Sequence, residues 1–163
     1  MSASDRLLEN AQRFAEAFDE ESVAKRPAPQ VAVVACMDAR LSPNRLLGLR
    51  EGDAHVIRNA GGVVTEDVIR SLTISQRLLG TREVILIHHS ECGMLTFTDD
   101  QVKEQILEDT GLRPTFALEA FPDVDEDVRQ SIRRIQASPF IPVKDSIRGF
   151  VYEVDKGTLR EVT

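Results

Sequence analysis

The stretch VAVVACMDAR, residues 31–40, decides the fold because it joins a buried strand to a cluster of reactive side chains. Residues 31–35 form a short, uninterrupted apolar run, which is typical of a strand that is covered on both faces. Cys36, Asp38 and Arg40 follow directly. These side chains are therefore expected at the carboxyl end of the strand, where open α/β sheets bind their ligands.

Strands and helices are predicted to alternate along the rest of the chain. Apolar runs indicate three more strands and an edge strand at residues 54–58, 84–87, 150–154 and 159–162. Capping residues and apolar stripes indicate helices that begin near Ser42, Thr65, Asp99 and Asp123. The alternation favours an α/β fold with a mainly parallel central sheet of about four strands, flanked by helices, and an extra edge strand at the C-terminus.

The N-terminal segment has its own pattern. Leu7, Ala11, Phe14 and Phe18 recur at the spacing of an amphipathic helix, and the segment 25–29 (KRPAP) separates them from the first strand. We therefore expect a single domain, 1–163, with an N-terminal helical arm at 1–26 and an α/β body at 30–163. The apolar face of the arm needs a partner, which predicts a homodimer or a dimer of dimers.

Composition excludes several classes of protein. The chain has 163 residues and a formal net charge of −7, which argues against a nucleic-acid partner because such a partner needs a basic face. No apolar stretch approaches the ~20 residues that span a bilayer, so no membrane partner is expected. Residues 1–5 (MSASD) do not resemble the start of a signal peptide, which favours a cytoplasmic location.

The chain has only two cysteines, Cys36 and Cys92, which are buried bystanders, a redox pair or metal ligands. His89 and Cys92 stand three residues apart, within reach of one metal ion. This H-x-x-C spacing is a weak signal by itself. If the first and third strands are neighbours, however, Cys36 converges on the same point, and thiolate and imidazole ligands suit zinc. Three protein ligands would leave the fourth position for water, as in catalytic zinc sites.

Taken together, these motifs resemble those of the β-class carbonic anhydrases, in particular short bacterial members, including mycobacterial ones. The family's paired signature is C-x-D-x-R followed by H-x-x-C-G, which is matched here by residues 36–40 (CMDAR) and 89–93 (HSECG). The intervening arginine-asparagine segment of the family corresponds to residues 58–62 (RNAGG). The resemblance covers residues 31–94, and the order of elements agrees beyond them.

The resemblance implies a function. Zn²⁺, one ion per chain, would be held by Cys36, His89 and Cys92, and a zinc-bound hydroxide would convert carbon dioxide reversibly to bicarbonate and a proton. Asp38 would accept the proton of the bound water, and Arg40 would hold Asp38 by a charge-assisted hydrogen bond. In a closed state, Asp38 would be the fourth zinc ligand. The family also builds its site at a dimer interface, with the N-terminal helix crossing to the partner.

Other residues have weaker assignments. His88 competes with His89 as a ligand, but strand alternation predicts that it points away. His55, Ala60, Gly61 and Gly93 are predicted to line the pocket, with His55 either a proton relay or a polar wall.

Arg58 resembles an arginine of a bicarbonate-sensing site in some members of the family. Those members also carry a nearby Trp, and the absence of Trp from this chain argues against such a site here.

Three alternatives remain open at this level. A related zinc hydrolase that acts on carbonyl sulfide or carbon disulfide would keep the same ligands. A non-catalytic zinc protein would use four protein ligands, with Asp38 as the fourth. A redox pair of cysteines is disfavoured because the chain has no C-x-x-C motif.

Overall fold

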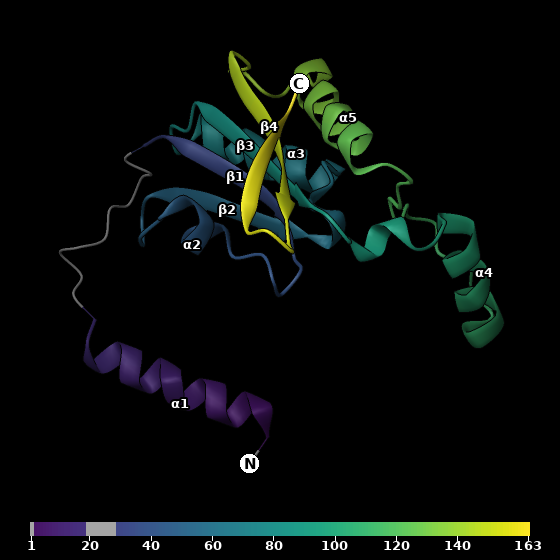
Figure 1. Ribbon diagram of the computed structural model, residues 1–163, viewed down its shortest axis with the longest axis horizontal. Helices are drawn as coiled ribbons and strands as arrows, with labels where there is room; N and C mark the ends of the chain where they lie inside the picture. Colours follow the sequence, from purple (N-terminus) through teal and green to yellow (C-terminus); the bar gives the residue numbers. More distant parts are fainter. Residues whose placement is uncertain (1, 19–28) are drawn as a thin grey trace.

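The computed structural model describes residues 2–18 and 29–163. Its centre is a five-stranded sheet in the order β2-β1-β3-β4-β5 (Figure 1). The strands are β1 (Val31–Cys36), β2 (Ala54–Asn59), β3 (Glu83–His89), β4 (Ser146–Glu153) and β5 (Thr158–Val162). The first four strands are parallel, and β5 is antiparallel to β4. The predicted α/β class, the mainly parallel sheet and the C-terminal edge strand are confirmed.

The helices begin and end close to the predicted capping residues. They are α1 (Ala3–Glu16), α2 (Pro43–Leu47), α3 (Glu66–Arg77), α4 (Asp99–Thr110) and α5 (Val124–Ala137), with short 3₁₀ turns η2 (Ala60–Gly62) and η3 (Gly93–Leu95). The side chains of Ser42, Thr65 and Asp123 each accept a hydrogen bond from the first turn, as predicted. The cap of α4 is Thr98, so Asp99 is its first helical residue.

Two apolar layers cover the sheet. On one face, α3 and α5 pack against the strands through a core of fully buried side chains that includes Val34, Leu72, Leu86 and Ile135. The other face carries a second apolar cluster that contains both cysteines, together with Leu41, Ile87 and Phe121. The candidate ligands therefore belong to a buried layer rather than to a surface loop.

Strand β4 begins at Ser146, four residues before the predicted start at Phe150. Arg148 and the following glycine interrupt the apolar run, so the apolar pattern alone does not predict this part of the strand. Gly149 has a packing reason: a Cβ at this position would collide with the side chain of Val128 on α5. The helix can therefore approach the sheet only where the strand has no side chain.

Helix α1 lies apart from the sheet (Figure 1) and buries none of its residues. Its apolar residues are open to solvent, with 68% of the surface of Leu7 and 56% of that of Phe14 exposed. The predicted linker residues 25–28 lie outside the described part of the chain, so the division into arm and body stays a prediction. Among the described residues, no helix combines the length and the apolar character needed to cross a bilayer.

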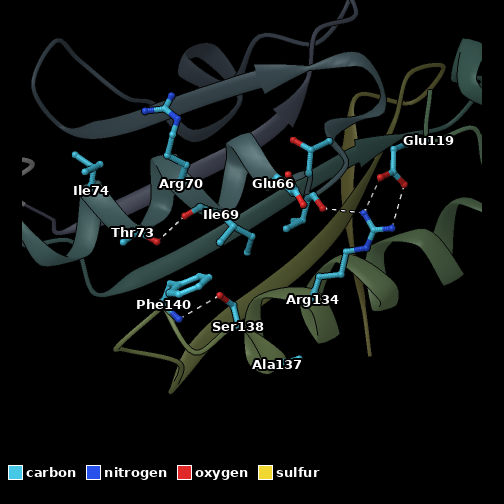
Figure 2. Close-up of a pocket in the computed structure, with 12 residues that line it drawn as sticks. Glu66, Ile69, Arg70, Thr73, Ile74, Glu119, Arg134, Ala137, Ser138 and Phe140 are labelled. Atoms are coloured by element: carbon cyan, nitrogen blue, oxygen red, sulfur yellow. Dashed lines mark hydrogen bonds and ion pairs between the residues drawn. The ribbon is translucent and has the colours of Figure 1, made fainter. Parts of the chain in front are cut away.

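A groove of about 890 Å³ separates α3 from α5 on the surface of the body (Figure 2). Apolar side chains, among them Ile69, Ile74 and Phe140, line much of it. At one end, Arg134 is bound bidentately by the carboxylate of Glu119, with distances of 3.0 and 3.1 Å. The same guanidinium donates to the carbonyl of Val64. The groove is thus an exposed apolar surface with a fixed ion pair at its end.

Gly62 allows η2 to press against the ends of β1 and β3. Its φ is +73°, and a Cβ added to it would lie 2.8 Å from the Cys36 nitrogen and 3.1 Å from the Ile87 oxygen. Both neighbours are backbone atoms of the central strands, so they cannot move aside as a flexible side chain would. Only glycine satisfies both the left-handed conformation and the close approach.

We predict that Gly62→Ala lowers the free energy of unfolding by about 3 kcal/mol or more, because it adds a backbone collision to the ~1–2 kcal/mol cost of a left-handed alanine. Gly48→Ala is the matched control, since its φ is +66° but its Cβ would meet nothing within 4 Å. Urea denaturation of both variants measures the difference. Equal losses of stability would contradict the close-packing argument.

Candidate metal centre

Neighbouring parallel strands bring the predicted ligands together. β1 and β3 pair directly, with Ala35 opposite Ile87. Cys36 therefore ends β1 at the same edge of the sheet at which His89 ends β3, and Cys92 follows three residues later. All three side chains are buried, and their ligand atoms lie within 4.8 Å of one another. The convergence inferred from the sequence depended on this strand order.

The distances within the group fit a single metal ion. The two Sγ atoms are 4.0 Å apart, and His89 Nε2 is 3.2 Å from Cys36 Sγ. Tetrahedral zinc with Zn–S bonds of about 2.3 Å would place two sulfurs about 3.8 Å apart. Both cysteines are free thiols rather than a disulfide. The residues present thus form a soft S₂N set, which suits zinc better than calcium or magnesium.

The hydrogen bond on the other side of the imidazole sets the tautomer of His89. Its Nδ1 lies 2.8 Å from the carbonyl oxygen of Ser90, which can only accept, so Nδ1 carries the proton. The lone pair is then on Nε2, the atom that faces the thiols. Such bonds orient metal-bound histidines and raise their basicity.

A hydrogen bond between the two thiols shifts their pKa values in opposite directions. A hydrogen bond with Cys92 lowers the pKa of Cys36 to about 4, and the same hydrogen bond, together with burial, raises the pKa of Cys92. This hydrogen bond thus favours the thiolate form of Cys36. A divalent cation would favour the thiolate form of both residues, because zinc binds Cys as the deprotonated sulfur.

Asp38 and Arg40 form a tight pair beside the three ligands. Arg40 donates from Nε to Oδ1 and from a terminal nitrogen to Oδ2, both at 3.0 Å, and its backbone N–H donates to Oδ1 at 2.8 Å. These bonds from Arg40 hold the pKa of Asp38 below its usual range. Asp38 Oδ2 lies 3.7 Å from His89 Nε2, so the paired carboxylate stands at the edge of the ligand group.

Arg40 also reaches the second ligand segment. It donates to the Glu91 carboxylate at 3.2 Å and to the Glu91 carbonyl at 3.3 Å. Glu91 has a positive φ of 55°, which turns the chain between His89 and Cys92. The guanidinium therefore links the segment after β1 to the segment after β3. The role of Glu91 was missed from sequence because an exposed acidic residue in a turn has no distinctive pattern.

The structure separates His88 and His55 from the ligand group. The side chain of His88 points to the opposite face of the sheet from His89, as predicted. Its Nε2 lies 2.7 Å from Asp127 Oδ2 on α5. His55 lies opposite Ala32, at the far end of β1 from Cys36, and its Nδ1 contacts the Ser75 hydroxyl at 2.7 Å. Within one chain, this position does not fit the predicted place of His55 in the pocket wall.

Of the other predicted lining residues, Gly61 lies within the cysteine-bearing layer. It is buried with φ +81°, and its missing Cβ leaves room for Met94 and Phe121. Ala60 and Gly93 are exposed at the starts of η2 and η3. Their lining role stays a prediction.

Phe121 reaches this layer from a loop that the sequence argument left without a role. It is 5% exposed and packs with both cysteines in the same apolar cluster. The Asp99 carboxylate fixes the loop by accepting the backbone N–H groups of Leu118 and Ala120 at 2.8 and 2.9 Å. The helix that begins at Asp99 thus anchors one wall of the cysteine-bearing layer.

Comparisons with known proteins agree with this geometry. The sequence profile of the carbonic anhydrase family matches residues 31–114. "Beta-carbonic anhydrase 1" of Mycobacterium tuberculosis is 57% identical over 163 residues, which cover 100% of this chain and 99% of that protein. This chain belongs to the β-carbonic anhydrase family. The family's members are zinc enzymes, and the Cys36–His89–Cys92 group is where this member has the donor set for that metal.

Solved structures and more distant relatives show how similar this carbonic anhydrase is to other members of the family. A crystal structure of carbonic anhydrase from Streptococcus mutans superposes with a TM-score of 0.92 at 41% identity, covering 100% of this chain and 99% of that one. A "Carbon disulfide hydrolase" of Acidithiobacillus thiooxidans is 37% identical over 149 residues, 78% of this chain and 74% of that protein. The identity to the mycobacterial enzymes is thus both higher and more extensive.

We predict that the purified protein carries about one zinc per chain, and that Cys36→Ser and Cys92→Ser lose most of it, because a hydroxyl is a far weaker zinc ligand than a thiolate. His88→Ala is the matched control: it removes a neighbouring buried imidazole that faces α5 rather than the thiols. Elemental analysis after dialysis measures the metal. Full zinc retention by Cys92→Ser, or loss of zinc from His88→Ala while the fold persists, would contradict the ligand assignment.

Proposed function

We propose that this chain catalyses the reversible hydration of carbon dioxide to bicarbonate and a proton. The observation that carries the proposal is the position of Asp38: its carboxylate is turned toward Arg40, at the edge of a buried S₂N ligand set. Three protein ligands leave one coordination position for water. Because Arg40 engages both oxygens of Asp38, this carboxylate would not be a fourth protein ligand.

The metal and the protein have separate tasks in this mechanism. Zinc, when bound, supplies the Lewis acidity that makes water nucleophilic near neutral pH. Cys36, His89 and Cys92 hold the ion. The carboxylate of Asp38 would accept a hydrogen bond from a water molecule held at this centre and so orient it for attack on the substrate. The low pKa of Asp38 keeps this group an acceptor at working pH.

Arg40 positions the acceptor. Its two side-chain bonds and one backbone bond fix both carboxylate oxygens of Asp38. A planar, bidentate pair is geometrically specific, and lysine would replace it poorly. Without this partner, Asp38 is free to become a fourth protein ligand and to close the centre to water. The pair is therefore what separates an enzyme from a structural zinc protein.

Apolar surroundings complete the centre. Leu41, Ile87 and Phe121 are buried in the cluster that contains both cysteines. A dry environment strengthens the electrostatic interactions of Asp38 and the thiolates, and a small apolar substrate needs no charged group to bind it. Hydrolysis of carbon disulfide is not favoured, because the relative with that activity in its name is less similar to this chain than the mycobacterial carbonic anhydrase is.

For the assembly, we propose a homodimer or a dimer of dimers. The apolar side chains of α1 are exposed, and the rings of Phe14 and Phe18 lie 5.7 Å apart between centroids in a tilted arrangement. The apolar groove between α3 and α5 is a second uncovered surface. Exposed apolar surfaces of this kind are typical of protein interfaces.

We propose that the enzyme works in the cytoplasm. The buried sulfurs of Cys36 and Cys92 lie 4.0 Å apart as free thiols. A reducing compartment keeps such a pair available to a metal, whereas an oxidising one favours disulfide formation.

We predict that Arg40→Ala keeps its zinc and its fold but loses carbon dioxide hydration by several orders of magnitude, because Asp38 then closes the centre. X-ray absorption should find four protein ligands in this variant even at alkaline pH. Arg82→Ala, which removes an exposed arginine whose side chain forms no hydrogen bond or ion pair among the described residues, should behave as wild type. Near-normal hydration by Arg40→Ala, measured by stopped flow, would refute the proposed role of the pair.

We also predict that Leu7→Glu combined with Phe14→Glu shifts the protein toward monomer, because charges would replace the apolar face of α1. Gln12→Glu adds a charge to the opposite, polar side of the same helix and should leave the assembly unchanged. Sedimentation velocity over a range of concentrations distinguishes the two outcomes. A wild-type protein that is a stable, fully active monomer would contradict the assembly proposal.

A further inference from the structure

Arg58 contacts the segment that carries half of the centre. Its Nε donates to the Cys36 carbonyl at 3.0 Å, and one terminal nitrogen lies 2.8 Å from the carbonyl oxygens of Cys36, Asp38 and Leu41. The residue stands near the end of β2, opposite Ala35. From there its side chain reaches the loop that follows β1. Three carbonyl groups of one short loop thus converge on one guanidinium.

These contacts differ from those of an ordinary surface arginine. Among the described residues, Arg58 forms no ion pair with a carboxylate, and every hydrogen bond of its side chain goes to main-chain oxygen. The three carbonyl oxygens all point at the same guanidinium, so their partial negative charges would repel one another if this cation were removed. Backbone acceptors left without a donor cost about 1–3 kcal/mol each when they are buried. The guanidinium is therefore needed for the loop to hold this shape.

Two main-chain hydrogen bonds and the contacts of Arg40 with Glu91 also hold this loop, but none of them reaches the carbonyls of Cys36 and Leu41. The Met37 N–H donates to the Asn59 carbonyl at 2.8 Å, and the Leu41 N–H donates to the Asp38 carbonyl at 3.1 Å. The stretch 36–41 contains Cys36, Asp38 and Arg40. A displacement of this stretch would move a ligand and the proton acceptor together.

We propose that Arg58 is a positioning residue: it holds the loop 36–41 in the shape that places Cys36 Sγ and the Asp38 carboxylate at the centre. The proposal rests on the proposed carbon dioxide hydration and adds to it a residue outside the ligand set and the Asp38–Arg40 pair. Since Nε and one terminal nitrogen of Arg58 donate to the loop, this role differs from the bicarbonate-sensing role of the similar arginine in some members of the family.

The test compares three variants: Arg58→Ala, Arg58→Lys and the control Arg82→Ala. Arg82 is also an exposed arginine, but among the described residues its side chain forms no hydrogen bond or ion pair. The first readout is amide hydrogen exchange of Met37, Arg40 and Leu41 in the zinc-free protein, with the Ser90 amide, bonded to Tyr152, as an internal reference. The second is zinc affinity by competition with a chelator. The third is kcat and KM for carbon dioxide.

In Arg58→Ala we expect exchange of the three loop amides to accelerate at least tenfold, with the Ser90 amide unchanged. Zinc affinity and kcat should each fall by about 10- to 100-fold, the usual effect of losing a residue that orients ligands, with little change in KM. Arg58→Lys should lie between wild type and Arg58→Ala, because an ammonium can reach only part of the carbonyl set. Millimolar guanidinium should partly restore kcat in Arg58→Ala and not affect Arg82→Ala.

Wild-type exchange rates of the loop amides together with wild-type kcat in Arg58→Ala would overturn the proposal. If Arg58→Ala does not fold, Arg58→Lys decides: wild-type exchange, zinc affinity and kcat in that variant would equally overturn it. The exchange and chelator readouts do not depend on catalysis. A wild-type protein without hydration activity would therefore refute the proposed function, while these two readouts would still decide the role of Arg58.

Discussion

The parallel pairing of β1 with β3 is the interaction on which the rest of the structure depends. It places Ala35 opposite Ile87, and so brings the ends of the two strands to one edge of the sheet. A slip of one residue would turn every side chain of a strand to the opposite face. His88 and His89 show the consequence, because the first is committed to Asp127 on α5 and the second to the thiols.

Several groups around this edge of the sheet each fix the position or protonation of one residue of the centre. Gly62 lets η2 close against the backbone of both strands, and the Ser90 carbonyl sets the proton of His89 on Nδ1. Arg40 ties the loop after β1 to the turn at Glu91, while it holds Asp38 by both oxygens. The charged groups thus orient one another, and the apolar layer beneath them keeps the thiols away from solvent.

The sequence was sufficient to predict the fold class and the convergence of Cys36, His89 and Cys92, for identifiable reasons. The apolar run before Cys36 predicts where the first strand ends. The spacing of His89 and Cys92 predicts which two side chains could share a metal ion. What could not be predicted depends on contacts without a sequence pattern. The early start of β4 is hidden by Arg148 and a glycine that fits beneath Val128, and the true place of His55 depends on strand register.

Arg58 and the Phe121 loop illustrate the same limit. Their roles rest on main-chain carbonyl and N–H groups, which every residue possesses and which no residue pattern distinguishes. Assembly around α1 is a different case: the amphipathic pattern was visible, but a single chain offers this helix nothing to pack against.

The most direct test of the account is stopped-flow measurement of carbon dioxide hydration by the wild-type protein before zinc removal, after removal and after reconstitution with one equivalent per chain. The account predicts rapid hydration that is lost with the metal and restored by it. Hydration no faster than buffer in the zinc-loaded protein, or equal rates with and without zinc, would contradict it.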